Sequence, residues 1–348
     1  MDKILTIVIP TYNMEKYLRK CLDSLIIDNR DLFSTLEVLV VIDGATDSSS
    51  TIAHEYQDKH PNVFRVIDKE NGNYGSCVNR GLLEAKGKYI KVLDADDTFD
   101  TCNFGDFISF LKIQDVDCVI SDMMQVDEDD ECKLLCRFNL SQSSIFSLDE
   151  MGENEWRKLW MHCVCYKTEN LRKINYRQTE GISYTDQEWI CLPMATSKQL
   201  SYFPHVVYKY LVGREGQTIS VDVWERNLWQ EIEGMKKMIS YHRSVADNYS
   251  LNTTYVNSRI VTRASAIYFA YFFKFKTNKN HDLVVSLDRF IKENSPICYQ
   301  QTQCVTVRKY FKFPIVKIWR KNYNDKSLLI IIYKGICKTL IKFFKLFR

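Results

Sequence analysis

KYIKVLDADDT, residues 88–98, places three carboxylates within four residues at the end of an apolar run. Tyr89 to Leu93 has the composition of a buried strand, whereas Asp94, Asp96 and Asp97 repel one another and resist burial without a partner. Divalent Mg²⁺ or Mn²⁺ prefers carboxylate oxygens, and a bound cation would offset this repulsion. Taken alone, the acids are equally consistent with a solvated turn.

Short apolar runs alternate with segments of helical spacing over the first 120 residues. The expected strands are 5–9, 38–42, 63–67, 89–93 and 116–120, and the expected helices are 15–27, 48–56 and 74–86. Nearly continuous apolar strands that alternate with helices predict a parallel sheet covered on both faces. The fold class is therefore α/β, a Rossmann-like, mostly parallel sheet flanked by helices, followed by a mainly helical C-terminal region.

The loops that follow three of these strands are expected on one rim, because ligands of open α/β sheets bind beyond the carboxyl ends of the strands. These loops are residues 10–13, 43–47 and 94–97. Tyr12 can stack on a base ring, and Asp43 can accept a hydrogen bond from a base or sugar. The chain has neither GxGxxG nor GxxxxGK[ST], which argues against a Rossmann dehydrogenase and a P-loop NTPase.

The second half of the chain is expected to divide near residue 220. Residues 126–150 are polar and acidic and predict a surface loop, residues 153–160 and 185–197 predict helices, and residues 202–212 predict a strand. From residue 222 onward the pattern is almost wholly helical. We therefore expect a domain at 1–220, a helical domain at 221–325, and a basic amphipathic helix at 326–348.

The end of the chain is strongly basic. Residues 307–348 hold 12 Lys or Arg and one acid, so this segment carries +11 and the remainder −8, against a net charge of +3. Four lysines, 334, 338, 342 and 345, share one narrow helical face, which suits the plane of an anionic membrane surface. The alternative is a helix packed on its own domain. Nucleic acid fits less well, because the apolar face is too broad.

The 12 cysteines are expected to be reduced, mostly buried thiols. The N-terminus carries no secretory signal, which predicts a cytoplasmic protein. Cys132, Cys136 and the His162–Cys165 segment lack a second cysteine pair at zinc-finger spacing, so a structural zinc is disfavoured.

Four stretches resemble glycosyltransferase family 2, the inverting enzymes of the GT-A fold. They are IVIPTYNMEKYLRKCLDSL, VLVVIDGATDSSSTIA, NGNYGSCVNRGLLEAKGKYIKVLDADD and YTDQEW, in the family's order within residues 1–220. The resemblance implies a nucleotide-diphosphate sugar donor and a divalent metal, Mn²⁺ or Mg²⁺, at Asp96. It also implies a ribose or sugar contact from Asp94. The remaining donor contacts that it implies are Pro10, Thr11, Tyr12, Asp43 and Asn79.

The resemblance also implies that Asp186 is the catalytic base. An inverting transfer needs one base to deprotonate the acceptor hydroxyl, and Asp186 opens a helical segment. An N-cap aspartate is the structural alternative, and Glu188 is the alternative base. The family often has Glu-Asp where this chain has Thr185-Asp186, and an Arg where this chain has Val78.

The lack of that arginine implies that another cation, Arg80 or Arg214, faces the diphosphate. We prefer Arg214, in the loop VGREGQTIS, with Gln217 and Thr218 as acceptor-binding helpers. His162 is expected either to border the acceptor or a metal, or to be a satisfied core histidine.

Together these features predict a metal-dependent glycosyltransferase. It would move a hexose or N-acetylhexosamine from a UDP-sugar to a hydroxyl of a glycan or lipid-linked glycan, as in cell-surface polysaccharide synthesis. It would act in the cytoplasm, peripherally on the inner face of the cell membrane, and would not bind nucleic acid. The alternatives are a sugar nucleotidyltransferase, and a non-catalytic, membrane-associated partner of a glycosyltransferase.

Overall fold

The computed structural model describes residues 2–142, 144–214, 221–246, 252–276, 279–307 and 310–345. The chain forms two compact units: residues 1–217 with 249–252, and residues 218–248 with 253–348. The first unit contains a nine-stranded sheet and the second is mainly helical. In the part of the chain that the structure describes, no helix is long and apolar enough to cross a membrane.

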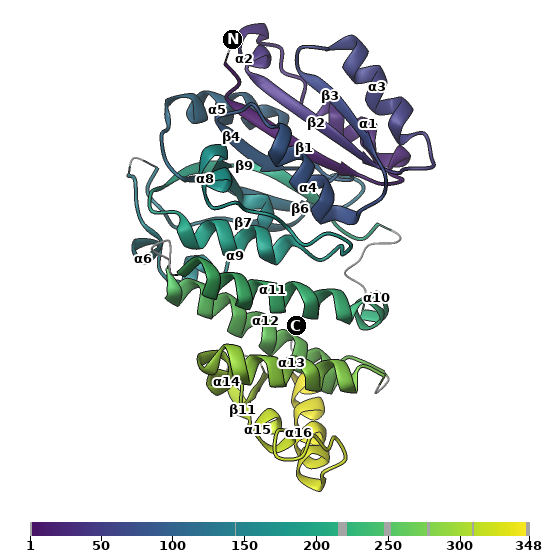
Figure 1. Ribbon diagram of the computed structural model, residues 1–348, viewed down its shortest axis with the longest axis vertical. Helices are drawn as coiled ribbons and strands as arrows, with labels where there is room; N and C mark the ends of the chain where they lie inside the picture. The colour runs from purple at the N-terminus through teal and green to yellow at the C-terminus, as the bar shows by residue number, and fades with distance from the viewer. Residues whose placement is uncertain are drawn as a thin grey trace. The chain divides into compact units, whose positions relative to one another are not determined.

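The first half of the sheet is parallel, as the alternating pattern predicts (Figure 1). Its strands run in the order β3-β2-β1-β4, and β1 is buried along its whole length. The strands are β1 (Leu5–Thr11), β2 (Leu36–Asp43), β3 (Phe64–Lys69) and β4 (Tyr89–Val92). The helices that connect them are α1 (Glu15–Asp23), α2 (Arg30–Ser34), α3 (Ser49–Lys59) and α4 (Asn73–Glu84). This order brings the loops after β1, β2 and β4 to one rim.

The second half of the sheet contains antiparallel pairs. Strand β8 pairs antiparallel with both β4 and β6, while β9 runs parallel to β6 and pairs antiparallel with β5. The strands are β5 (Thr98–Phe99), β6 (Cys118–Val126), β7 (Cys132–Cys136), β8 (Val164–Lys167) and β9 (Leu200–Leu211). The surface loop expected at 126–150 thus contains an edge strand, β7, whose residues are mostly exposed.

Helices complete the first unit around this sheet. They are α5 (Thr101–Ile113), α6 (Leu148–Met151), α7 (Glu153–Trp156), the 3-10 turn η1 (Met161–Cys163), α8 (Thr168–Lys173) and α9 (Asp186–Thr196). Helix α4 lies directly on β1, because Gly81 allows a close approach: a Cβ at this position would come within 2.4 Å of Val8. This packing fixes α4, and with it the residues that begin the helix near the rim.

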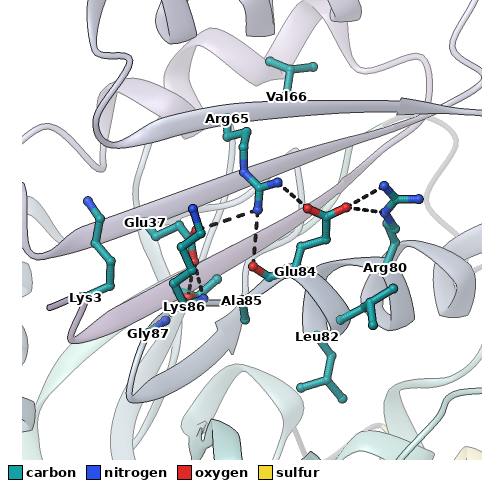
Figure 2. A network of polar contacts seen from close by, with 12 residues as sticks. Lys3, Glu37, Arg65, Val66, Arg80, Leu82, Glu84, Ala85, Lys86 and Gly87 are labelled. Atoms are coloured by element: carbon teal, nitrogen blue, oxygen red, sulfur yellow. Dashed lines mark hydrogen bonds and ion pairs between the residues drawn. The ribbon is translucent and has the colours of Figure 1, made fainter.

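A polar network joins α4 to the sheet, as Figure 2 shows. The buried carboxylate of Glu37 accepts hydrogen bonds from the Thr6 hydroxyl, at 2.6 Å, and from the backbone N–H of Lys86, at 2.7 Å. Arg65 and Arg80 both pair with Glu84 at the C-terminal end of α4. The network therefore ties the last turn of α4 to the strands.

The second unit is held by a buried ion pair. Arg320 Nε lies 2.8 Å from Asp288 Oδ1, and Tyr268 donates its hydroxyl proton to the same carboxylate at 2.5 Å. Its helices are α10 (Val221–Arg226), α11 (Leu228–Ala246), α12 (Thr253–Phe273), α13 (His281–Asn294), α14 (Pro296–Gln301), α15 (Ile315–Trp319) and α16 (Leu328–Lys345). Strands β10 (Val305–Val307) and β11 (Phe311–Phe313) form a short antiparallel pair in this unit.

Candidate functional site

The loops after β1 and β2 are joined by hydrogen bonds at the rim of the sheet. Asn13, with a φ of 52°, accepts the backbone N–H of Thr46 on its side-chain oxygen at 2.8 Å. Asp47 accepts the N–H of Glu15 at 3.0 Å, and Ser49 accepts the N–H of Met14 at 2.8 Å. These bonds fix the loop that carries Tyr12, a residue that is 50% exposed.

The three acids that follow β4 each have their own partner. Asp94 accepts the hydroxyl proton of Tyr74 at 2.6 Å. Asp97 is buried and accepts two hydrogen bonds, from the Tyr208 hydroxyl and from the backbone N–H of Leu211, both at 2.7 Å. Asp96 forms an ion pair with Arg214, with Nε and Oδ2 2.5 Å apart.

Crowding and burial make ionisation of two of these acids costly. Burial, reinforced by the charge of Asp96, raises the pKa of Asp94 to about 7. The same two causes, with Asp94 as a further neighbour, raise the pKa of Asp97. A cation at this rim would therefore stabilise the ionised cluster.

His162 lies beside the cluster in an aromatic sandwich. Its ring centroid is 4.6 Å from those of both Tyr208 and Tyr210. Burial, together with the nearby charge of Lys91, lowers the pKa of His162 to about 3, so the ring is neutral. Among the described residues, the buried Nδ1 atom of His162 has no hydrogen-bond partner.

His162, Asp94 and Asp97 can together hold a metal ion. One ligand atom from each lies within 4.8 Å of the others. Two carboxylates and a neutral imidazole form a donor set that suits Mn²⁺ and related divalent ions. Asp96, the ligand expected from the sequence, is adjacent in the chain but instead pairs with Arg214.

A cavity of about 290 Å³ lies against the outer side of the cluster. Three lysines, Lys16, Lys20 and Lys209, line it together with Asp96 and Asp97. Lys16 pairs with Glu128, and Lys209 pairs with acids of the first unit. The Arg214 guanidinium lies 5.4 Å from the centroid of the Tyr17 ring, another residue of the cavity wall.

Asp186 is the first residue of α9 and lies close to the cluster. Its charge contributes to the raised pKa values of both Asp94 and Tyr74, after burial and nearer groups. Glu188 is buried and accepts hydrogen bonds from the backbone N–H of Thr179, at 2.9 Å, and from its hydroxyl, at 2.7 Å. Of the two candidate bases, Glu188 thus holds the loop before α9, and Asp186 faces the charged rim.

The remaining donor residues expected from the sequence divide between the ends of β1 and β2, where Pro10, Thr11 and Asp43 lie, and helix α4, which carries Asn79. Pro10 and Thr11 are buried at the end of β1. Asp43 uses one carboxylate oxygen for Lys69, at 2.5 Å, and for the N–H of Gly72, at 2.9 Å. Asn79 binds the backbone of Gln178 and lines a second cavity of about 530 Å³ with Arg80, which shares no lining residue with the first. The predicted acceptor residues Gln217 and Thr218 lie outside the described residues.

Sequence reasoning did not assign Asp97, Tyr74 or Tyr208. The third acid of the DADD run is a visible signal for Asp97, but the two tyrosines carry none. Tyr208 is 111 residues from Asp97, and its hydroxyl meets that carboxylate only through the pairing of β5 with β9.

A sequence profile described as Glycosyl transferase family 2 matches residues 6–167. An uncharacterised glycosyltransferase of Mycoplasma pneumoniae is 43% identical over 98 residues, 28% of this chain and 32% of that protein. The minor teichoic acid biosynthesis protein GgaB of Bacillus subtilis is 28% identical over 219 residues, 61% of this chain and 23% of that protein. The chain thus matches about a third of one relative's length and about a quarter of the other's.

The fold is similar to that of a solved structure of S. aureus TarS, residues 1–349, in complex with UDP-GlcNAc. The TM-score is 0.67 at 20% sequence identity, and the match covers 86% of this chain and 84% of that one. The GT-A fold expected from the sequence is confirmed by this likeness.

Proposed function

We propose that this chain is a glycosyltransferase that moves a hexose or N-acetylhexosamine from a UDP-sugar to a glycan hydroxyl, because its residues 6–167 match the Glycosyl transferase family 2 profile. The observation that carries the proposal is the meeting of the Asp94–Asp97 cluster, His162 and Asp186 beyond the strand ends. The UDP-GlcNAc complex of TarS supports the choice of donor. The relationship to GgaB, a minor teichoic acid biosynthesis protein, supports an acceptor in cell-surface polysaccharide synthesis. We propose that a lipid-linked glycan is among the acceptors.

The residues of the cluster fit a divalent metal. Asp94, Asp97 and one ring nitrogen of His162 would hold it, and Asp96 would become a further ligand if it separated from Arg214. Bound Mn²⁺ or Mg²⁺ would neutralise the charge that develops on a diphosphate leaving group. Tyr12 would stack on the base, and Asp43 would accept a hydrogen bond from the nucleoside on its second carboxylate oxygen.

Asp186 is proposed as the base of an inverting transfer. Its carboxylate would accept the proton of the acceptor hydroxyl while that oxygen attacks the anomeric carbon. The bond from the anomeric carbon to the nucleoside diphosphate breaks, and the diphosphate leaves with the bonding electrons. Tyr74, which donates to Asp94, lies near Asp186 and would help to keep the two carboxylates apart.

The first experiment is a screen of nucleotide sugars for release of nucleoside diphosphate in Mn²⁺, repeated with EDTA. We expect release from at least one UDP-sugar and loss of release in EDTA. Absence of both binding and turnover across the panel would contradict the proposal. Release of pyrophosphate from a nucleoside triphosphate and a sugar phosphate would instead support a nucleotidyltransferase. Donor binding without any turnover would support the non-catalytic alternative.

The second experiment tests the base. An Asp186→Asn variant should lower kcat at least about 100-fold, the lower end of the effect of a general base, while UDP binding in Mn²⁺ stays unchanged. Glu188→Gln is the matched control, because its carboxylate already accepts two bonds from Thr179. Full transfer activity in the Asp186 variant would refute the assignment.

We further propose that α16 binds the surface of an anionic membrane on the cytoplasmic side. One side of the helix packs within its own unit through Ile330 and Cys337, which are buried. The opposite side leaves Leu328, Leu329, Ile331, Ile332 and Ile336 between 44% and 71% exposed. At about 100° per residue, Lys338 and Lys342 lie together along one edge of this apolar face, and no acid occurs between residues 326 and 345. The side chains thus match an interfacial helix more closely than a buried one.

Liposome flotation tests this surface. The full chain should float with vesicles that contain anionic phosphatidylglycerol and remain unbound with neutral phosphatidylcholine vesicles. Ile332→Asp with Ile336→Asp should abolish flotation, because both residues are exposed and their loss leaves the packed side intact. Equal flotation of this double variant and the parent chain would remove the membrane proposal.

A further inference from the structure

We propose that Arg214 is an exchangeable counter-ion: it pairs with Asp96 in the free enzyme, is displaced by a divalent cation, and then pairs with the donor diphosphate. The proposal rests on the proposed function, because it takes the acidic cluster as the site of the metal and the diphosphate. It goes further because it gives the Arg214 side chain two partners, one after the other: Asp96 and then the diphosphate.

The pair that Arg214 makes is shielded from water. The Asp96 and Arg214 side chains are only 11% and 14% exposed, and the contact is 2.5 Å. At this degree of burial the attraction is screened less than in a surface ion pair. The Tyr17 ring also contacts the arginine, with its centroid 5.4 Å from the guanidinium. Arg214 is thus well held as long as Asp96 is its partner.

Arg214 has a distinct position among the cations near the cluster. Among the described residues, it is the one basic side chain that forms an ion pair with any of Asp94, Asp96 and Asp97. Two lysines of the neighbouring cavity form ion pairs with other acids: Lys16 with Glu128, and Lys209 with Asp100 and Asp130. The third, Lys20, lies on α1. A cation that binds Asp96 must therefore compete with Arg214 and with no other described side chain.

The three partners of the cluster differ in how they can respond to a metal. Tyr74 and Tyr208 are neutral donors, and a carboxylate that accepts one hydrogen bond keeps other lone pairs for a metal. A guanidinium is a positive charge, so it repels a divalent cation at the same carboxylate. Gly213, with a φ of 89° and open space where a Cβ would stand, precedes Arg214 at the end of β9. The displaced arginine then offers a planar pair of donors to a diphosphate.

This exchange predicts effects of opposite sign on the two ligands. Without donor, Arg214→Ala should bind Mn²⁺ about tenfold more tightly than the parent chain, because the competing charge is gone. With Mn²⁺ present, the same variant should bind UDP about tenfold more weakly, because the diphosphate has lost a partner. A merely structural arginine would weaken both ligands together. Lys20→Ala is the matched control: it removes a charge from the same cavity wall and should change both affinities less than twofold.

Isothermal titration of the full chain measures both steps, with MnCl₂ alone and then with UDP in saturating Mn²⁺. The tighter Mn²⁺ binding should vanish when Asp96→Asn is added to Arg214→Ala, since the competition needs that carboxylate. If the parent chain binds Mn²⁺ and UDP but Arg214→Ala binds Mn²⁺ equally or more weakly, the exchange is wrong and the proposed function stands. If the parent chain binds neither ligand, the proposed function and the exchange fail together.

Discussion

Replacing Tyr208 by Phe removes one oxygen atom that connects two parts of the rim. The hydroxyl donates to Asp97 at 2.7 Å and accepts the backbone N–H of Asp94 at 3.0 Å. A hydrogen bond to a charged group contributes about 1.5–3 kcal/mol and a neutral one about 0.5–1.5 kcal/mol. The bond to Asp97 is buried, the bond to Asp94 is partly buried, and the ring remains, so we expect the free energy of unfolding to fall by about 2–4 kcal/mol.

The full chain is unfolded by heating, and the Tm of the first unit's transition is measured. For a unit of this size, each 1 kcal/mol lowers Tm by about 2–4 °C, so the expected decrease is about 4–16 °C. The ring of Phe keeps the packing of Tyr208 on Phe99 and His162, at 5.6 and 4.6 Å between centroids, so the change reports the hydroxyl.

Tyr210→Phe is the matched control on the same strand. Its ring also stacks on His162, at 4.6 Å, but among the described contacts its hydroxyl makes no hydrogen bond. We expect this variant to unfold within about 2 °C of the parent, as surface-like substitutions do. If Tyr208→Phe also unfolds within that range, the hydroxyl does not stabilise the acidic turn, and the account of how Asp97 is kept buried is wrong.

Two further predictions concern packing around the same rim. Gly81→Ala should lower the free energy of unfolding by about 1–3 kcal/mol, because its Cβ would come within 2.4 Å of Val8. Gly105→Ala in α5, with no atom nearer than 3.6 Å, should leave the free energy of unfolding unchanged or raise it by up to about 1 kcal/mol. Denaturant titration compares the two variants, and equal effects would contradict the close packing of α4 on β1. Glu188→Gln should lower the free energy of unfolding by about 1–3 kcal/mol, because it weakens the hydrogen bonds to Thr179, while transfer activity stays within about tenfold of the parent. A loss of kcat as large as that of Asp186→Asn would make Glu188 the base.

The parallel half of the fold could be predicted from the sequence because its signal is local. Strands β1, β2 and β4 are short, nearly continuous apolar runs, and each ends in the polar residues that form the rim. The antiparallel strands give weaker signals. Strand β8 has four residues, and the exposed edge strand β7 has the polar flanks of a loop. Their places depend on tertiary pairing, which periodicity does not report.

The candidate site was predictable to a similar extent. Tyr12, Asp94 and Asp96 follow directly from the strand ends, because the sheet topology alone brings them to one edge. The partners of the acids do not follow, since Tyr74, Tyr208 and Arg214 are 20, 114 and 118 residues away from the acid or backbone group that each contacts. These contacts depend on how α4 packs on the sheet and where β9 runs in it.

The distribution of partners explains how a strand can end in three acids. Asp97 is the most buried of the three and has two fixed donors, one of them a backbone N–H that cannot leave without disturbing β9. Asp94 has one neutral donor at the start of α4. Asp96 has the charged partner, Arg214, which follows β9 and a glycine in the left-handed region. Asp97, which we propose as a metal ligand with Asp94 and His162, thus also anchors the turn to β9, while Asp96 is the carboxylate whose partner we propose to be exchangeable for a ligand.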